Sequence, residues 1–294
     1  MTYQRTTFIA SAAAAACLLS ATPSDAGVFT TSFDSPTYSA NTINGQDGWI
    51  AQLQWRADGA GNITNVATND PPTNAGAFVR AHNLNVLGST AVGETMTITS
   101  SFTLGDYADP STDIGTFEEG IFQQGLSHQQ GVANFGYGLA AGLFYSANKP
   151  DKNVELRAAV GTVTSGTTAL VIGEASTLGG TSYTLVTSFT KVADDSWSVT
   201  ATLSDGVNPP SSISYVASAG VDLNTDSDGG GILGGIQGLP SGGGSAGVAT
   251  PPFGSTTVSD FTIEVIPVPE PVAAMAGVAA LGLIGLRRSS RRIV

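Results

Sequence analysis

The chain has 294 residues and a formal net charge of −12 at pH 7, with 11 basic and 23 acidic residues. A surface of that sign repels phosphate backbones, so nucleic acid is excluded as a partner. Cys17 is the single cysteine, and His82 and His128 are the only histidines. Intrachain disulfides, zinc–thiolate sites and multi-histidine metal sites are therefore excluded as well.

Residues 1–26 have the pattern of a secretory signal peptide. Arg5 precedes an apolar, alanine-rich run from Phe8 to Leu19, and Ser24-Asp25-Ala26 puts small residues at the two positions that a signal peptidase reads. The run is too short to be a permanent membrane span. We therefore expect the export machinery and signal peptidase as partners, with cleavage after Ala26. An ordinary buried helix is the competing interpretation.

Residues 267–294 form a tail in three parts. The first is Val268-Pro269-Glu270-Pro271, and an uncharged apolar run over 272–286, expected as a helix, follows it. A basic cluster at 287–292 closes the chain, with Arg287, Arg288, Arg291 and Arg292. The 15-residue run is short against the roughly 20 residues that a helix needs to cross a bilayer. Arginines that stay cytoplasmic would leave the body of the protein outside, so the tail predicts membrane contact.

The order of these three parts resembles the PEP-CTERM sorting signal of Gram-negative bacteria. The resemblance implies an exosortase-like enzyme as a partner, cleavage near the Pro-Glu-Pro motif, and transient anchoring in the inner membrane. The mature protein would then belong to the cell surface, the envelope or the extracellular matrix. A plain tail anchor is the alternative.

Short alternating runs between the two ends predict antiparallel strands. These runs are Glu94–Leu104, Asn153–Val163, Tyr183–Phe189, Ser196–Leu203 and Ser255–Val265. The glycines of Gly131–Tyr145 favour a strand in a closely packed sheet, and Asp194-Asp195 and Asp205-Gly206 favour turns. We therefore predict an all-β chain: one antiparallel jelly-roll-like β-sandwich over 27–266. Residues 226–254, rich in Gly, Ser and Pro, are expected to be a loop inserted before the last strand.

Two further stretches carry a second resemblance. Phe33-Asp34-Ser35-Pro36-Thr37-Tyr38 with Asn44-Gly45-Gln46-Asp47-Gly48-Trp49, and the run around Trp197 with Leu203-Ser204-Asp205-Gly206, look like exported domains of the concanavalin A-like lectin/glucanase class. The resemblance implies a jelly roll and, as a common use of it, carbohydrate binding. It supplies no catalytic residue.

Enzymatic signals are weak throughout. Glycoside hydrolysis needs two carboxylates about 5–10 Å apart. Glu118 and Glu119 are adjacent, so a strand would point them to opposite faces, and we expect them on a loop or edge. Glu155 stands alone in its run, and no Gly-x-Ser-x-Gly elbow accompanies a histidine. We therefore predict a protein that is not an enzyme.

Two candidate binding sites remain. Trp49, Trp55 and Arg56 have the residue types of a sugar-stacking site, although core packing is the competing interpretation for the tryptophans. Asp222, Asn224, Asp226 and Asp228 have the spacing of calcium ligands, although the twelfth-position Glu of an EF-hand loop is missing. A solvated acidic loop is the favoured interpretation of that run. Calcium bound by these four residues is the alternative, and it is the one cofactor that the sequence suggests.

Three functions stay open. The first is a surface or matrix protein without catalysis whose partner is an extracellular polysaccharide. The second is an exported glycan-active hydrolase of the same fold. The third is a purely structural envelope component.

The sorting interpretation makes a direct prediction about the mature protein. We expect mass spectrometry of envelope material to find the chain without Arg291 and Arg292, since cleavage near 268–271 removes both. Intact C-terminal peptides from the envelope would instead support the plain tail anchor.

Overall fold

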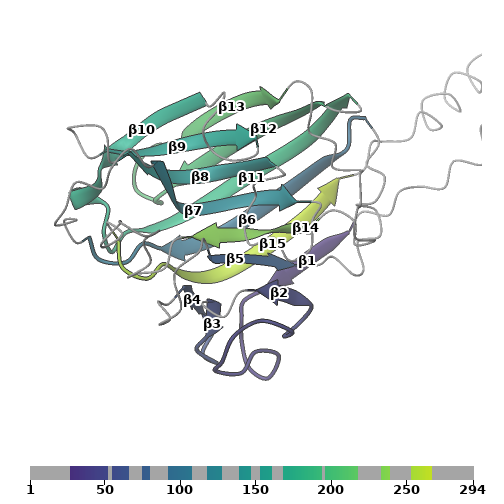
Figure 1. The fold of residues 1–294 in the computed structure, drawn as a ribbon, viewed down its shortest axis with the longest axis vertical. Helices are drawn as coiled ribbons and strands as arrows, with labels where there is room; N and C mark the ends of the chain where they lie inside the picture. Colours follow the sequence, from purple (N-terminus) through teal and green to yellow (C-terminus); the bar gives the residue numbers. More distant parts are fainter. Residues whose placement is uncertain are drawn as a thin grey trace, which may run out of the picture. The chain divides into compact units, whose positions relative to one another are not determined.

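Antiparallel strands make up most of the described chain in the computed structural model (Figure 1). The structure describes residues 27–51, 55–65, 75–79, 92–107, 118–127, 139–146, 153–160, 168–193, 196–217, 233–238 and 253–266. These residues belong to one compact unit, Ala26–Ile266. The predicted all-β sandwich is confirmed, whereas the predicted signal peptide and sorting tail lie outside the described residues.

Eight strands form the first sheet. Across the sheet their order is β13 (Ser211–Ala217), β12 (Ser196–Ser204), β11 (Ser182–Ala193), β6 (Thr95–Thr103), β15 (Thr257–Ile266), β4 (Ile63–Asn65) and β3 (Trp55–Ala57), and β1 (Val28–Thr31) also pairs with β15. The first and last described strands are thus neighbours, with Val28 opposite Glu264.

Seven strands form the second sheet. Their order is β10 (Thr168–Glu174), β9 (Asn153–Val160), β8 (Leu139–Ser146), β7 (Glu118–Ser127), β14 (Leu233–Gly238), β5 (Ala75–Val79) and β2 (Trp49–Ala51). A short 3-10 helix at Ala175–Thr177 follows β10. No helix among the described residues is long and apolar enough to cross a bilayer.

The alternating runs correspond closely to strands β6, β9, β11, β12 and β15, so those predictions are confirmed. The second half of the glycine-rich run at 131–145 forms β8, and residues 131–138 lie outside the description. The predicted turn at Asp205-Gly206 joins β12 to β13. There the Asp205 carboxylate accepts the backbone N–H groups of Asn208 at 2.7 Å and Val207 at 2.9 Å, and these bonds hold its pKa below the ordinary value.

The prediction of a loop over 226–254 is wrong for residues 233–238. They form β14, between β7 and β5 in the seven-stranded sheet. Its glycines suit a strand here because there is no room for side chains. A Cβ on Gly234 would lie 2.8 Å from Ile263 Cδ1, and one on Gly238 would lie 2.9 Å from the Ile121 carbonyl oxygen.

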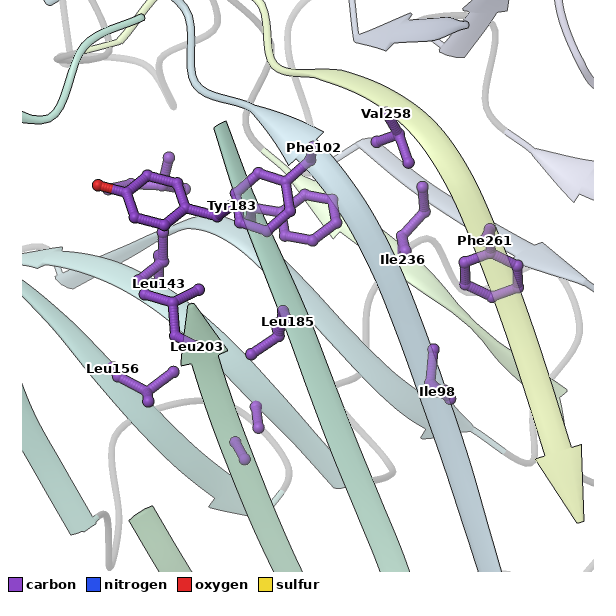
Figure 2. Close-up of a cluster of buried hydrophobic side chains, with 14 of the residues drawn as sticks. Ile98, Phe102, Leu143, Leu156, Tyr183, Leu185, Leu203, Ile236, Val258 and Phe261 are labelled. Atoms are coloured by element: carbon purple, nitrogen blue, oxygen red, sulfur yellow. The ribbon is translucent and has the colours of Figure 1, made fainter. Parts of the chain in front are cut away.

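The core lies between the two sheets. Side chains from both meet there, with Ile98, Tyr183 and Leu185 from one sheet and Leu143, Leu156 and Ile236 from the other (Figure 2). Phe102 and Phe122 stack across the core with ring centroids 4.0 Å apart. Gln124 is one of the buried polar residues in this layer. Its amide donates to the Leu185 carbonyl, and its oxygen accepts the Thr187 hydroxyl, so the buried amide is satisfied and links the sheets.

Gly142 on β8 lies close against the backbone of the neighbouring strand β7. A Cβ there would collide with the Phe122 carbonyl oxygen and lie 2.6 Å from Gln123 Cα, both backbone atoms of β7. The pairing of β7 and β8 also shifts register between Gly120 and Phe122, which marks a bulge in β7. Only glycine fits this position.

Substitution of Gly142 by alanine tests that constraint. We expect Gly142→Ala to lower the free energy of unfolding by about 2–3 kcal/mol, since backbone must move to admit the methyl group. Gly173→Ala is the matched control, because a Cβ on Gly173 meets its nearest atom, Leu178 Cδ2, at an ordinary 3.5 Å. Equal denaturation midpoints for the two variants would contradict the close approach.

Candidate functional site

The two tryptophans considered as sugar platforms are core residues. Trp49 is 1% exposed and Trp55 is 0% exposed. The Trp49 ring packs against Phe33 and Phe261, with centroids 5.8 and 5.1 Å away. Neither tryptophan has a face on which a sugar could stack, so the core interpretation holds for both. Arg56, between Trp55 and Ala57 on β3, points the other way and is exposed.

A hydrogen-bonded chain anchors the Trp49 side chain. Its Nε1 donates to the Tyr38 hydroxyl at 2.8 Å, and that hydroxyl donates to the Asp47 carboxylate at 2.9 Å. Burial raises the pKa of Tyr38 to about 12. In this chain of hydrogen bonds the phenol both accepts from Trp49 and donates to Asp47, so it must keep its proton.

The raised pKa predicts how stability changes at high pH. The folded state binds the Tyr38 proton more tightly than the unfolded state does, so this contribution is complete below pH 10 and is lost between about pH 10 and pH 12. We expect denaturation curves to show stability falling more steeply over that range in the natural protein than in Tyr38→Phe, by about 2 kcal/mol in total. Parallel pH profiles would contradict the shift.

Other residues raised by the sequence fall outside the described ranges. These are Asp222, Asn224, Asp226 and Asp228, both histidines, the Val268–Pro271 motif and the terminal arginines. Within the described ranges no group of three or more His, Cys, Asp or Glu side chains could hold a metal ion. Glu118 and Glu119, expected on a loop or edge, are the first two residues of β7.

The outer face of the seven-stranded sheet carries a set of buried polar residues. On β9, Val154, Leu156 and Ala158 belong to the core, so the alternation of a strand puts Glu155 and Arg157 on the opposite face. By the same alternation Gln123 and Gln237 lie on that face of β7 and β14, beside Phe122 and Ile236, which face the core. We call Gln123, Glu155, Arg157 and Gln237 the polar cluster.

An ion pair is the central contact of the polar cluster. Arg157 donates through Nη2 and Nε to Glu155 Oε2, at 2.6 and 2.8 Å, and the guanidinium lies 5.6 Å from the centroid of the Phe144 ring. Phe144 is buried but lies outside the core between the sheets. The ring and the carboxylate together fix the orientation of the guanidinium.

The strand register aligns three members of the polar cluster in one row. Gln237 pairs with Gln123, Gln123 with Gly142, and Gly142 with Arg157. Gly142 contributes no side chain, so the row carries the side chains of Gln237, Gln123 and Arg157 alone. The row therefore combines amide donors and acceptors with a cation.

Protein stability alone does not explain why the four side chains of the polar cluster are buried. Arg157 is 3% exposed and Glu155 is 2% exposed, and Gln123 and Gln237 are 5% and 6% exposed. Removing an ion pair from water costs more free energy than packing apolar side chains of similar size, so such a pair is weak support for a purely structural role. Its place on a sheet face outside the core makes the polar cluster the candidate functional site.

Sequence reasoning missed most of this site. Glu155 was noted only as a lone acid, although Arg157 two residues later had to share its face in a strand. Gln123 and Gln237 are surrounded by glycines that hide the strand pattern. The i, i+2 spacing of Glu155 and Arg157 was the one signal that could have identified the pair.

Comparison with known proteins identifies the fold. Peanut lectin matches at 14% identity with a TM-score of 0.53, covering 83% of this chain and 99% of its own. Basic winged bean lectin, solved with Tn-antigen, matches at 8% identity with a TM-score of 0.51, covering 83% and 100%. The fold is the lectin jelly roll.

The same fold does not by itself give a function. A β-1,3-glucanase from Mycobacterium marinum also matches, at 12% identity with a TM-score of 0.41, covering 80% of this chain and 97% of its own. A similarity at that TM-score says nothing about the activity of this chain. No family model matches the sequence, and no curated protein matches it. A jelly roll hosts binding proteins and enzymes alike, so the function has to be argued from the site.

Proposed function

We propose that this chain binds neutral carbohydrate through the polar cluster on the outer face of its seven-stranded sheet. The observation that carries the proposal is the buried Glu155–Arg157 pair, whose arginine lies in register with Gln123 and Gln237. A side-chain amide both donates and accepts, a guanidinium only donates and a carboxylate only accepts. Such a mixed set matches sugar hydroxyls, which do both.

Charge favours neutral sugars over acidic ones. The chain carries a net charge of −12, so polyanionic polysaccharides are repelled at long range. The cation of the polar cluster already has Glu155 as its partner, and an acidic sugar would have to compete with that carboxylate. Neutral glycans meet neither obstacle.

Access sets a condition on binding. All four side chains of the polar cluster are at most 6% exposed, so a saccharide reaches them only when the chain around them opens locally. Association should then be slower than simple diffusional encounter allows.

The polar cluster supports binding better than hydrolysis. Glycosidases place two carboxylates about 5–10 Å apart. The residues two positions from Glu155 on β9 are Asn153 and Arg157, and the row across the sheet contributes amides and a glycine. Glu155, the carboxylate of the polar cluster, is engaged by Arg157. An exported glycan hydrolase of the same fold is the alternative.

The proposed cellular location rests on the sequence alone. We propose that the chain is exported by its N-terminal signal and sorted to the cell surface or extracellular matrix by its C-terminal tail. The acidic, disulfide-free composition suits a soluble exported domain that relies on its core.

A glycan array of neutral oligosaccharides, probed with the full chain, tests the binding function. We expect binding to a subset of the array, and about tenfold weaker binding for Gln123→Ala and for Gln237→Ala, since each loses hydrogen bonds to the sugar. Gln46→Ala is the matched control, because it removes a glutamine that hydrogen-bonds only within the loop before β2.

Three results would overturn the binding function. Absence of binding across the array would remove it, and equal weakening in Gln46→Ala would assign the effect to general loss of stability. Release of shorter sugars from β-glucans by the natural chain would establish the hydrolase instead.

A further inference from the structure

On four strands of the eight-stranded sheet, the outer face carries no charged side chain over most of each strand's length. On β6, β11, β12 and β13 the core-facing residues alternate with outward ones that are partly or fully exposed. Over Thr95–Thr103, Ser182–Thr190, Ser196–Ser204 and Ser212–Val216, each outward residue is serine or threonine except Val186 and Val216. We call this surface the hydroxyl face. It is unusual in a chain with 23 acidic residues.

Charge marks the border of the hydroxyl face. The next strand, β15, carries Asp260 and Glu264 at exposed positions, opposite Ser101 and Thr97. Lys191, the basic residue of β11, faces inward and is 5% exposed. Two copies of an acidic chain repel each other least when the surfaces in contact carry no charge.

Most hydroxyls of this face pair with one another across the strands. Cross-strand pairs join Thr95 to Thr190 at 2.8 Å, Thr97 to Ser188 at 3.1 Å and Thr202 to Ser212 at 2.8 Å. Thr103–Ser182 and Thr200–Ser214 form two more pairs, at 2.8 and 3.2 Å. These bonds reduce the number of polar groups that lose a hydrogen bond when water leaves the face, and so lower the cost of desolvation.

We propose that the hydroxyl face is a self-association surface on which a second copy of this chain stacks sheet to sheet. An isologous contact places the same flat, uncharged, internally paired surface on both sides, so no complementary charge is needed. The occupant that the surface fits is a second copy.

The size of the hydroxyl face is sufficient for such a contact. The hydroxyl face has three strands of nine residues and one of five, which at about 4.8 Å between strands and about 3.4 Å per residue cover about 520 Å² per copy. A dimer would then bury about 1,000 Å², the size at which a specific interface begins and the weak end of the range. The contact uses the sheet opposite to the polar cluster, so it is independent of the proposed sugar binding.

Sedimentation equilibrium of the full chain tests the proposal. We expect a monomer–dimer equilibrium over micromolar concentrations. Thr200→Asp and Thr200→Lys should each weaken it by about a hundredfold or more, because each buries an unpaired charge near the centre of the contact. Val207→Asp, in the turn after β12 and 87% exposed, is the matched control and should dimerise normally.

Several outcomes would overturn the proposal. A natural chain that stays monomeric throughout would do so without any variant, whether or not the variants fold. Dimerisation that survives in folded Thr200→Asp or Thr200→Lys would place the contact elsewhere, for example in the apolar termini. Equal loss in Val207→Asp would show that added charge acts regardless of position.

Discussion

The period of two in a β-strand is the constraint on which the rest of this structure depends. Each strand gives one side chain to the layer between the sheets and the next to an outer face. The inner layer is apolar and aromatic, and its stacked pair Phe102–Phe122 brings the sheets together. Once that layer is fixed, every remaining position of each strand must face outward, so the character of the outer faces follows from the alternate residues.

The two outer faces use these positions in opposite ways. The seven-stranded sheet places an ion pair, an aromatic ring and two amides there, all removed from water. The eight-stranded sheet places paired hydroxyls there, in contact with water. One face thus carries specific hydrogen-bonding groups at a cost in desolvation, and the other minimises that cost. This difference is why recognition is assigned to one face and self-association to the other.

Sequence patterns predicted the strands wherever apolar and polar residues alternate cleanly, as in β6 and β12. They failed at β14, where Gly234 and Gly238 resemble parts of a flexible loop, because steric demands from neighbouring strands are invisible in one sequence. The tryptophans were ambiguous for a related reason. Composition cannot say whether Trp55 meets solvent, and only packing shows that it is buried. The polar cluster depends on pairing between distant strands, so the row from Gln237 to Arg157 could not be assembled before the register was known.

The most direct measurement of sugar recognition by the seven-stranded sheet is an amide NMR titration of the full chain with neutral oligosaccharides. Recognition by the polar cluster predicts that the largest shifts occur at Gln123, Gln237 and their neighbours on β7, β9 and β14, while the amides of β12 and β13 stay unchanged. Shifts confined to the eight-stranded sheet, or to the loop around Arg56, would contradict it.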